Sequence, residues 1–210
     1  MKHYISNTSP RKAAITVGVA FITSVVLVTI IDDFLLANFV IPGDTSTLEK
    51  DIEADRQSFI LAVIGYFFVL ILDSVIGLAL YIVLKPASRK LAWYTAELRL
   101  LYAFTLMFGL FALVFQIIDV PDYASLKLFG YIFFALHLLV LGYSVFKSGY
   151  IPKSLGILLM FTSFTYIVFF IDSSGLTEIL SLAIMLLMLI AELSLSIWLL
   201  WKRNGLPQRT

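Results

Sequence analysis

Six long apolar stretches, separated by shorter polar segments, run through the chain. They cover residues 13–31, 58–84, 93–118, 128–146, 154–171 and 179–201. A helix needs roughly 20 apolar residues to cross a hydrocarbon core of about 30 Å, and only helices satisfy their backbone hydrogen bonds within one such segment. The pattern therefore predicts an all-α polytopic membrane protein, a bundle of six transmembrane helices that forms one domain over residues 1–210.

The polar segment at residues 32–57 is the longest, and we expect it to be an outer loop. Its apolar part, residues 34–41, either extends the first helix or lies along the membrane interface. Ser46 and Glu49 have capping-box spacing, which predicts a helix that starts there and runs into the second span.

Basic residues are concentrated in alternate polar segments. The N-terminus, the second and fourth loops and the C-terminal tail hold Lys2, Arg11, Lys12, Lys85, Arg89, Lys90, Lys147, Lys153, Lys202, Arg203 and Arg209. Lys and Arg in short loops mark the cytoplasmic side of a membrane protein. The pattern predicts that both termini lie in the cytoplasm, as an even number of spans requires, and that the protein resides in the cytoplasmic (inner) membrane.

Composition excludes several classes of protein. Only 14% of residues are charged and 60% are hydrophobic, whereas a soluble domain carries about 25% charged residues. The net charge of +1 offers no concentrated basic face for nucleic acid. Cysteine is absent, which excludes disulfides and thiolate metal sites. We expect membrane lipids to be the partners of this chain. The sequence leaves open whether the chain forms a homo-oligomer, and no motif implies a cofactor or a metal.

Three acid–base side chains interrupt the apolar stretches near their middles. Asp73 lies 12 residues before Lys85, or about 18 Å from the basic boundary of its span. His137 and Glu192 lie about 15 Å from theirs, so all three share one layer. Arg99 enters the third span from the basic side, and its long side chain can reach this layer. Because Asp73 and Arg99 lie on consecutive antiparallel helices, we predict that they form an ion pair. His137 and Glu192 either join this pair or form a second pair with each other.

Three interpretations of this candidate site remain open at the level of sequence. An ionisable group at this depth costs at least about 2.5–3.5 kcal/mol, so the layer either binds a proton, a cation or a small solute for transport, or binds a ligand. Alternatively, it is a structural network that fixes helix packing in an accessory membrane component. A metal-dependent intramembrane hydrolase is the weakest interpretation, because no HExxH or GxSxG motif is present. Tyr166 and Ser163 on the fifth span are candidate supporting residues.

One stretch of the chain resembles a known family. His137-Leu138, Leu141-Gly142-Tyr143, Phe146 to Lys153 and Leu155-Gly156 are similar to the most recognisable part of a bacterial six-helix family, domain of unknown function 4386. Shorter similar pieces are Pro42-Gly43-Asp44, Leu72-Asp73, Leu84-Lys85-Pro86 and Glu97-Leu98-Arg99. The resemblance spans residues 11–170, and the last helix shows the least of it. It implies an integral inner-membrane protein and carries no established catalytic residues.

Overall fold

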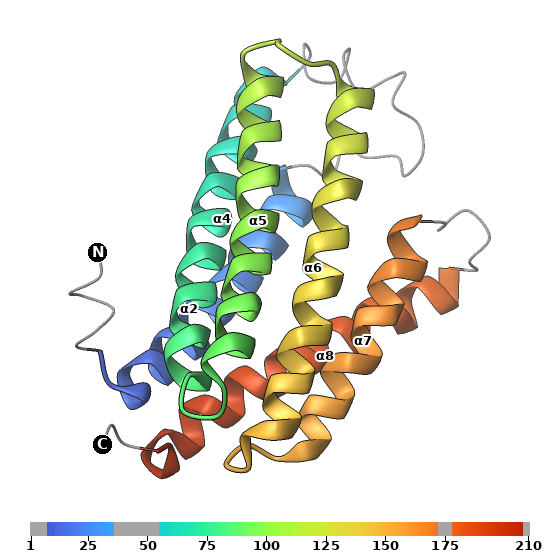
Figure 1. The fold of residues 1–210 in the computed structure, drawn as a ribbon. Coiled ribbons are helices and arrows are strands. Elements are labelled where there is room, and N and C mark those ends of the chain that lie inside the picture. The colour runs from blue at the N-terminus through green and yellow to red at the C-terminus, as the bar shows by residue number, and fades with distance from the viewer. Residues whose placement is uncertain (1–7, 36–54, 172–177, 208–210) are drawn as a thin grey trace.

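Helices make up nearly all of the part of the chain that the structure, a computed structural model, describes: residues 8–35, 55–171 and 178–207 (Figure 1). The elements are α2 (Pro10–Ile30), the π-helix η1 (Ile31–Leu35), α4 (Arg56–Leu84), α5 (Arg89–Val114), α6 (Val120–Ser148), α7 (Lys153–Ile171), α8 (Glu178–Lys202) and the 3-10 turn η2 (Arg203–Gly205). Five helices are long and apolar enough to cross a membrane, and α7 is equally apolar but shorter over its described length. The predicted all-α, multi-pass fold is confirmed.

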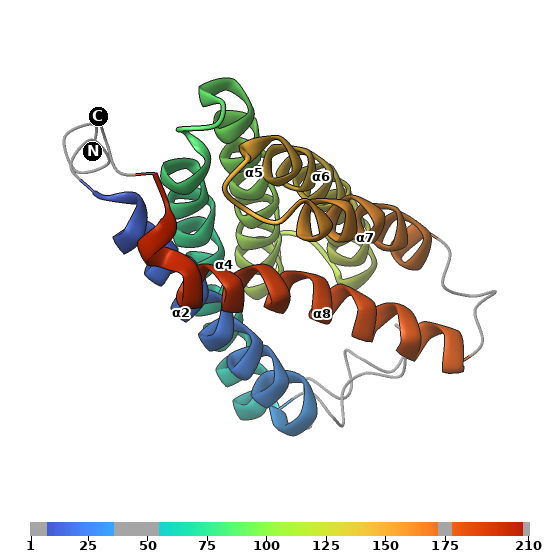
Figure 2. The ribbon, with the colours of Figure 1, turned by 90° about the horizontal axis from the view of Figure 1, so that it is seen from below.

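The helices close into a ring in the order of the chain. Each of α2, α4, α5, α6 and α7 packs on the next, and α8 packs on both α7 and α2. Figure 2 shows how α8 passes across the bundle from α7 to α2, and Figure 1 shows that it slants relative to the more upright α4, α5 and α6. A closed ring gives every helix one side that faces its neighbours, so polar groups from several helices can meet inside it.

Basic side chains gather at one end of this ring. The start of α2, the α4–α5 turn, the α6–α7 turn and the end of α8 all lie at the lower end in Figure 1. We call this the basic end, because it carries Arg11, Lys12, Lys85, Arg89, Lys90, Lys147, Lys153, Lys202 and Arg203. The α5–α6 connection, with Asp119 and Asp122, lies at the opposite end. The basic segments, which alternate with other polar segments along the sequence, therefore lie together at one end of the bundle.

Polar caps determine where four of the helices begin. Ser9, Asp55, Ser88 and Asp119 each accept a hydrogen bond from a backbone N–H three residues later, at 3.3, 3.1, 3.4 and 2.9 Å. These side chains satisfy N–H groups that the first turn of a helix leaves without partners. Asp55 has the non-helical backbone angles φ −135° and ψ 65°, so α4 begins at Arg56 and the predicted helix does not run through residue 55 into the second span. The predicted start at Ser46 lies outside the described residues, as does most of the outer loop.

The ends of two helices differ from the predicted spans. α5 ends at Val114, four residues before the predicted boundary, because Gln116 turns into the left-handed region with φ 55°. Its closing bonds, Ile117 N–H to Ala112 O and Gln116 N–H to Leu113 O, are those of a Schellman motif. The apolar Ile117 and Ile118 concealed this end. At the end of the first helix, η1 carries the helical path through Leu35.

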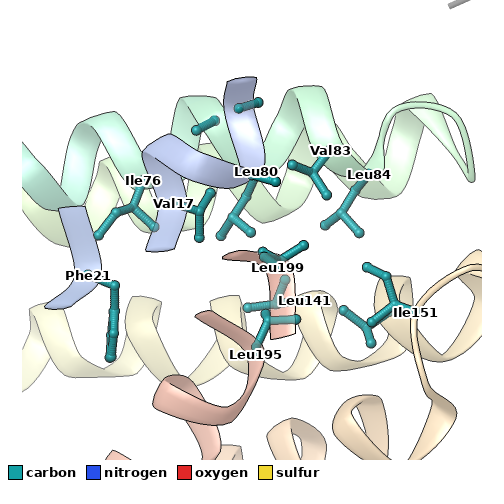
Figure 3. Packing of buried hydrophobic residues seen from close by; sticks show 14 of the residues in the cluster. Val17, Phe21, Ile76, Leu80, Val83, Leu84, Leu141, Ile151, Leu195 and Leu199 are labelled. Carbon is teal, nitrogen blue, oxygen red and sulfur yellow. The ribbon is translucent and has the colours of Figure 1, made fainter. Parts of the chain in front are cut away.

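The main apolar core lies between the middle of the bundle and the basic end. Figure 3 shows its members, which come from α2, α4, α6, α8 and the α6–α7 turn: Val17, Phe21, Ile76, Leu80, Val83, Leu84, Leu141, Ile151, Leu195 and Leu199. All are buried. Residues far apart in the sequence thus form one continuous apolar cluster.

Two glycines bring α6 and α7 into backbone contact. A Cβ atom on Gly142 would lie 2.6 Å from the Gly156 carbonyl oxygen, and one on Gly156 would lie 2.6 Å from that of Gly142. Small residues permit such close approach between helices in lipid, where packing is a main source of association. Both glycines belong to the stretch that resembles the known family, so this stretch has a packing role.

Candidate functional site

Four ionisable side chains from four helices meet inside the ring. Asp73 on α4, Arg99 on α5, His137 on α6 and Glu192 on α8 retain only 6%, 3%, 0% and 9% of their exposure. Tyr166 on α7 joins them through its hydroxyl group. We refer to these five residues as the polar cluster. The helices supply one member each because the ring places each of them beside its neighbours.

Arg99 and Asp73 form the predicted ion pair. The Arg99 Nε–H donates to Asp73 Oδ1 at 3.1 Å, and Nη2–H donates to the same oxygen. A guanidinium that donates twice to one carboxylate forms a short, strong, charge-assisted contact. Asp73 is therefore the principal counter-ion of Arg99.

His137 contacts the Arg99 guanidinium at Nη1, a nitrogen atom that does not bind Asp73. Its Nδ1 lies 2.7 Å from the Thr95 carbonyl oxygen, and its Nε2 lies 3.3 Å from Arg99 Nη1. Because a carbonyl oxygen can only accept, Nδ1 carries the proton and Nε2 accepts from Arg99. His137 is then a neutral imidazole, and it adds no charge to the polar cluster. Thr95 lies one turn before Arg99 on α5, so this one helix supplies both hydrogen-bond partners of the His137 imidazole.

Glu192 is held more loosely than Asp73. Its Oε2 lies 3.9 Å from Arg99 Nη1, beyond hydrogen-bonding distance, and its Oε1 accepts a hydrogen bond of 3.1 Å from the Tyr166 hydroxyl. Glu192 thus approaches the guanidinium without a direct hydrogen bond to it.

Aromatic rings enclose the polar cluster. The Phe134 ring lies under the Arg99 guanidinium, with 5.2 Å between Cζ and the ring centroid. Its centroid also lies 5.0 Å from that of Tyr166 and 4.7 Å from that of Tyr102. A cation over a ring face is attracted by the ring quadrupole, and the contact is stronger when water is excluded. These rings make the surroundings of Arg99 apolar, which strengthens every charge interaction there.

The charges of the polar cluster do not balance when both acids are ionised. One guanidinium then faces two carboxylates, while His137 is neutral. An excess charge in an apolar interior is expensive, and groups in that position bind a proton or a counter-ion instead. With both acids ionised, the polar cluster has one carboxylate more than Arg99 can compensate, and Glu192 is the acid without a direct hydrogen bond to the guanidinium.

The predicted supporting residue Ser163 lies on α7 and contacts α6. Its hydroxyl donates to the Ala135 carbonyl oxygen at 2.8 Å, which links α7 to α6. Thr95 and Phe134 were missed, although Phe134 lies three residues before His137 and therefore on the same helix face. Ser24 on α2 was missed as well. It is 7% exposed, and its hydroxyl has no hydrogen-bond partner among the described residues.

The metal interpretation finds no support in the geometry. Across residues 8–35, 55–171 and 178–207, no group of three His, Asp or Glu side chains is arranged to hold a metal ion. The nitrogen atoms of His137 already face Thr95 and Arg99. Neither nitrogen is directed at a site that a metal would occupy.

Comparison with known proteins identifies a family without an assigned function. The family described as domain of unknown function (DUF4386) matches residues 16–127 and 115–202, so the chain belongs to this family. The match includes α8 and Glu192, so it extends beyond residue 170, where the resemblance seen in the sequence ended.

A relative from Archaeoglobus fulgidus, described as an uncharacterized protein, is 38% identical over 109 residues. The alignment covers 52% of this chain and 65% of that protein, slightly less than two thirds of its length. No solved structure matches this chain.

Proposed function

We propose that this member of the DUF4386 family is a protein of the cytoplasmic membrane with both termini in the cytoplasm, and that its polar cluster binds one exchangeable proton or small cation at Glu192. The basic end supports the orientation, because Lys and Arg in short loops face the cytoplasm. The class of function is small-solute or cation transport, or ligand binding, that depends on the charge at Glu192.

One observation carries the proposal: two carboxylates surround one guanidinium. Asp73 takes the two hydrogen bonds from Arg99 that compensate its charge. Glu192 is left with a contact of 3.9 Å and a hydroxyl donor. A proton on Glu192 makes the polar cluster neutral, and its loss restores the excess charge. Intramembrane acids of this kind form proton and ion pathways in other membrane proteins.

A structural network is the second candidate, and a separate observation favours it. Among the described residues, no side-chain atom of the polar cluster is a buried polar atom without a hydrogen-bond partner. A network in which the fully buried polar atoms are hydrogen-bonded rigidifies a fold and favours one packing of the helices. In that case the polar cluster would hold α4, α5 and α6 together and exchange nothing.

Proton flux into liposomes separates the two candidates. The purified protein is reconstituted, a pH difference is imposed, and an enclosed dye reports its decay for wild type and for Glu192→Gln. We expect faster decay in the wild type alone. Glu97→Gln is the matched control, because it removes an exposed carboxylate on α5 and leaves the polar cluster intact. Equal rates for wild type and Glu192→Gln would favour the structural network.

A further inference from the structure

A second site, distinct from the polar cluster, lies at the basic end. A pocket of about 310 Å³ is lined by Tyr81 at the end of α4 and by Arg89, Lys90, Trp93 and Tyr94 in the first turns of α5. Its volume lies at the lower limit of small-ligand sites, which begin at about 300 Å³. The proposed proton exchange makes no use of it.

Two cations give this pocket its charge. Arg89 and Lys90 are exposed, and no acidic side chain lines the pocket. Neither cation forms an ion pair with any of the residues that the structure describes. Glu97, the next acid along α5, lies one turn beyond Trp93 and outside the lining. An anion can therefore approach both cations, and guanidinium and ammonium groups are common ligands of phosphate.

Aromatic side chains form the remainder of the pocket. Trp93 and Tyr94 are 58% and 51% exposed, and the Trp93 ring meets the Tyr81 ring edge to face at 6.1 Å. They lie about one turn further from the basic end than Arg89 and Lys90. Trp and Tyr prefer the depth of lipid headgroups, where one side of the ring is apolar and the other is wet. The pocket thus changes from cationic to aromatic in the direction of the bilayer interior.

We propose that this pocket binds an anionic phospholipid. The phosphate contacts Arg89 and Lys90, and the part of an acyl chain nearest the headgroup lies along Trp93. A free anion would use the two cations alone. The exposed aromatic wall fits a molecule with a phosphate at one end and hydrocarbon at the other, which matches the order of side chains along α5. Basic residues next to a membrane span attract anionic lipids through the same charge.

Native mass spectrometry of the full chain in a neutral detergent tests this site. The probes are phosphatidylglycerol and phosphatidylcholine with identical acyl chains. We expect the wild type to bind phosphatidylglycerol about tenfold more tightly, and Arg89→Gln/Lys90→Gln to lose this preference. Lys147→Gln/Lys153→Gln is the matched control, because it removes two charges at the same end but outside the pocket. The control should keep the preference.

Three outcomes would overturn the assignment. One is equal binding of the two lipids by the wild type, and another is an equal loss of preference in the control. The third is displacement of phosphatidylglycerol by inorganic phosphate at the same concentration, which would identify a free anion as the ligand. If Arg89→Gln/Lys90→Gln does not fold, a second readout remains. In Trp198→Phe/Trp201→Phe, Trp93 is the one tryptophan left, and brominated phosphatidylglycerol should quench its fluorescence more than brominated phosphatidylcholine does.

Discussion

The two acids beside Arg99 differ in how the protein holds them. On the α4 side, Asp73 accepts hydrogen bonds from both Nε and Nη2 of the guanidinium. On the α8 side, Glu192 approaches Nη1 only to 3.9 Å and relies on the Tyr166 hydroxyl for its hydrogen bond. Both carboxylates are at least nine-tenths buried. At equal burial, the number of hydrogen bonds from the cation distinguishes a fixed counter-ion from an acid that can exchange a proton.

The largest expected effect comes from removing both acids. Asp73→Asn/Glu192→Gln leaves Arg99 buried without a counter-ion, which should destabilise the protein by about 3–5 kcal/mol. Asp73→Asn alone should cost about 1–3 kcal/mol, because Glu192 can release its proton and replace the lost charge. Glu192→Gln should change stability by about 1 kcal/mol or less, since Gln is close in shape to a protonated Glu. Reversible unfolding in detergent measures all three variants.

This prediction depends on non-additivity. If Glu192 takes over from Asp73, the double variant must lose more stability than the sum of the single variants. Additive losses would show that the two acids act independently, and the comparison between them would fail.

The next effect separates the α7–α8 side from the rest of the polar cluster. Gly142→Ala places a Cβ atom 2.6 Å from the Gly156 carbonyl oxygen, so α7 must move away from α6. Such overpacking costs about 1–3 kcal/mol, and Tyr166 moves with α7. Thermal unfolding should show the loss.

Gly77→Ala is the matched control for this variant. The nearest atom to its new Cβ would be Arg99 Cβ at 3.4 Å, an ordinary contact, and Ala favours a helix over Gly by about 1 kcal/mol. Its stability should stay the same or rise. If both variants lost equal stability, close approach of α6 and α7 would not be the cause.

The smallest effect concerns Asp55, an exposed acid outside the membrane that provides a reference for the two buried ones. Its hydrogen bonds with Ser58 hold the pKa of Asp55 below its ordinary value of 3.8. A lowered pKa in the folded protein stabilises the fold above that ordinary value, and the contribution disappears as the pH falls through the folded pKa. Asp55→Ala should therefore melt below the wild type at neutral pH and match it in strong acid. A difference that persists in strong acid would point to a contribution other than the carboxylate.

Much of the fold could be predicted from the sequence because lipid imposes simple rules on it. The lengths of the apolar stretches predicted the helices. The positions of Lys and Arg predicted which helix ends lie together at the basic end. The end of α5 was missed, because Gln116 adopts a left-handed conformation that usually belongs to glycine, within an apolar context. Helix ends depend on such single residues, whereas the existence of a span depends on twenty.

The polar cluster was predictable in part. Asp73 and Arg99 lie on consecutive antiparallel helices, so their positions along the two spans were enough to predict their ion pair. The contact of Glu192 with Arg99 requires α8 to pass across to α2 and close the ring, and no local pattern encodes that path. The His137 tautomer was equally inaccessible, because it depends on the Thr95 backbone carbonyl of a neighbouring helix.

The protonation of Glu192 is the central claim, and infrared difference spectroscopy tests it most directly. The spectrum of Glu192→Gln is subtracted from that of the wild type at neutral pH. We predict a carbonyl band of a protonated carboxylic acid in the wild type, and its disappearance in Asp73→Asn, where Glu192 must ionise to balance Arg99. A difference spectrum that contains only the bands of an ionised carboxylate would contradict the account.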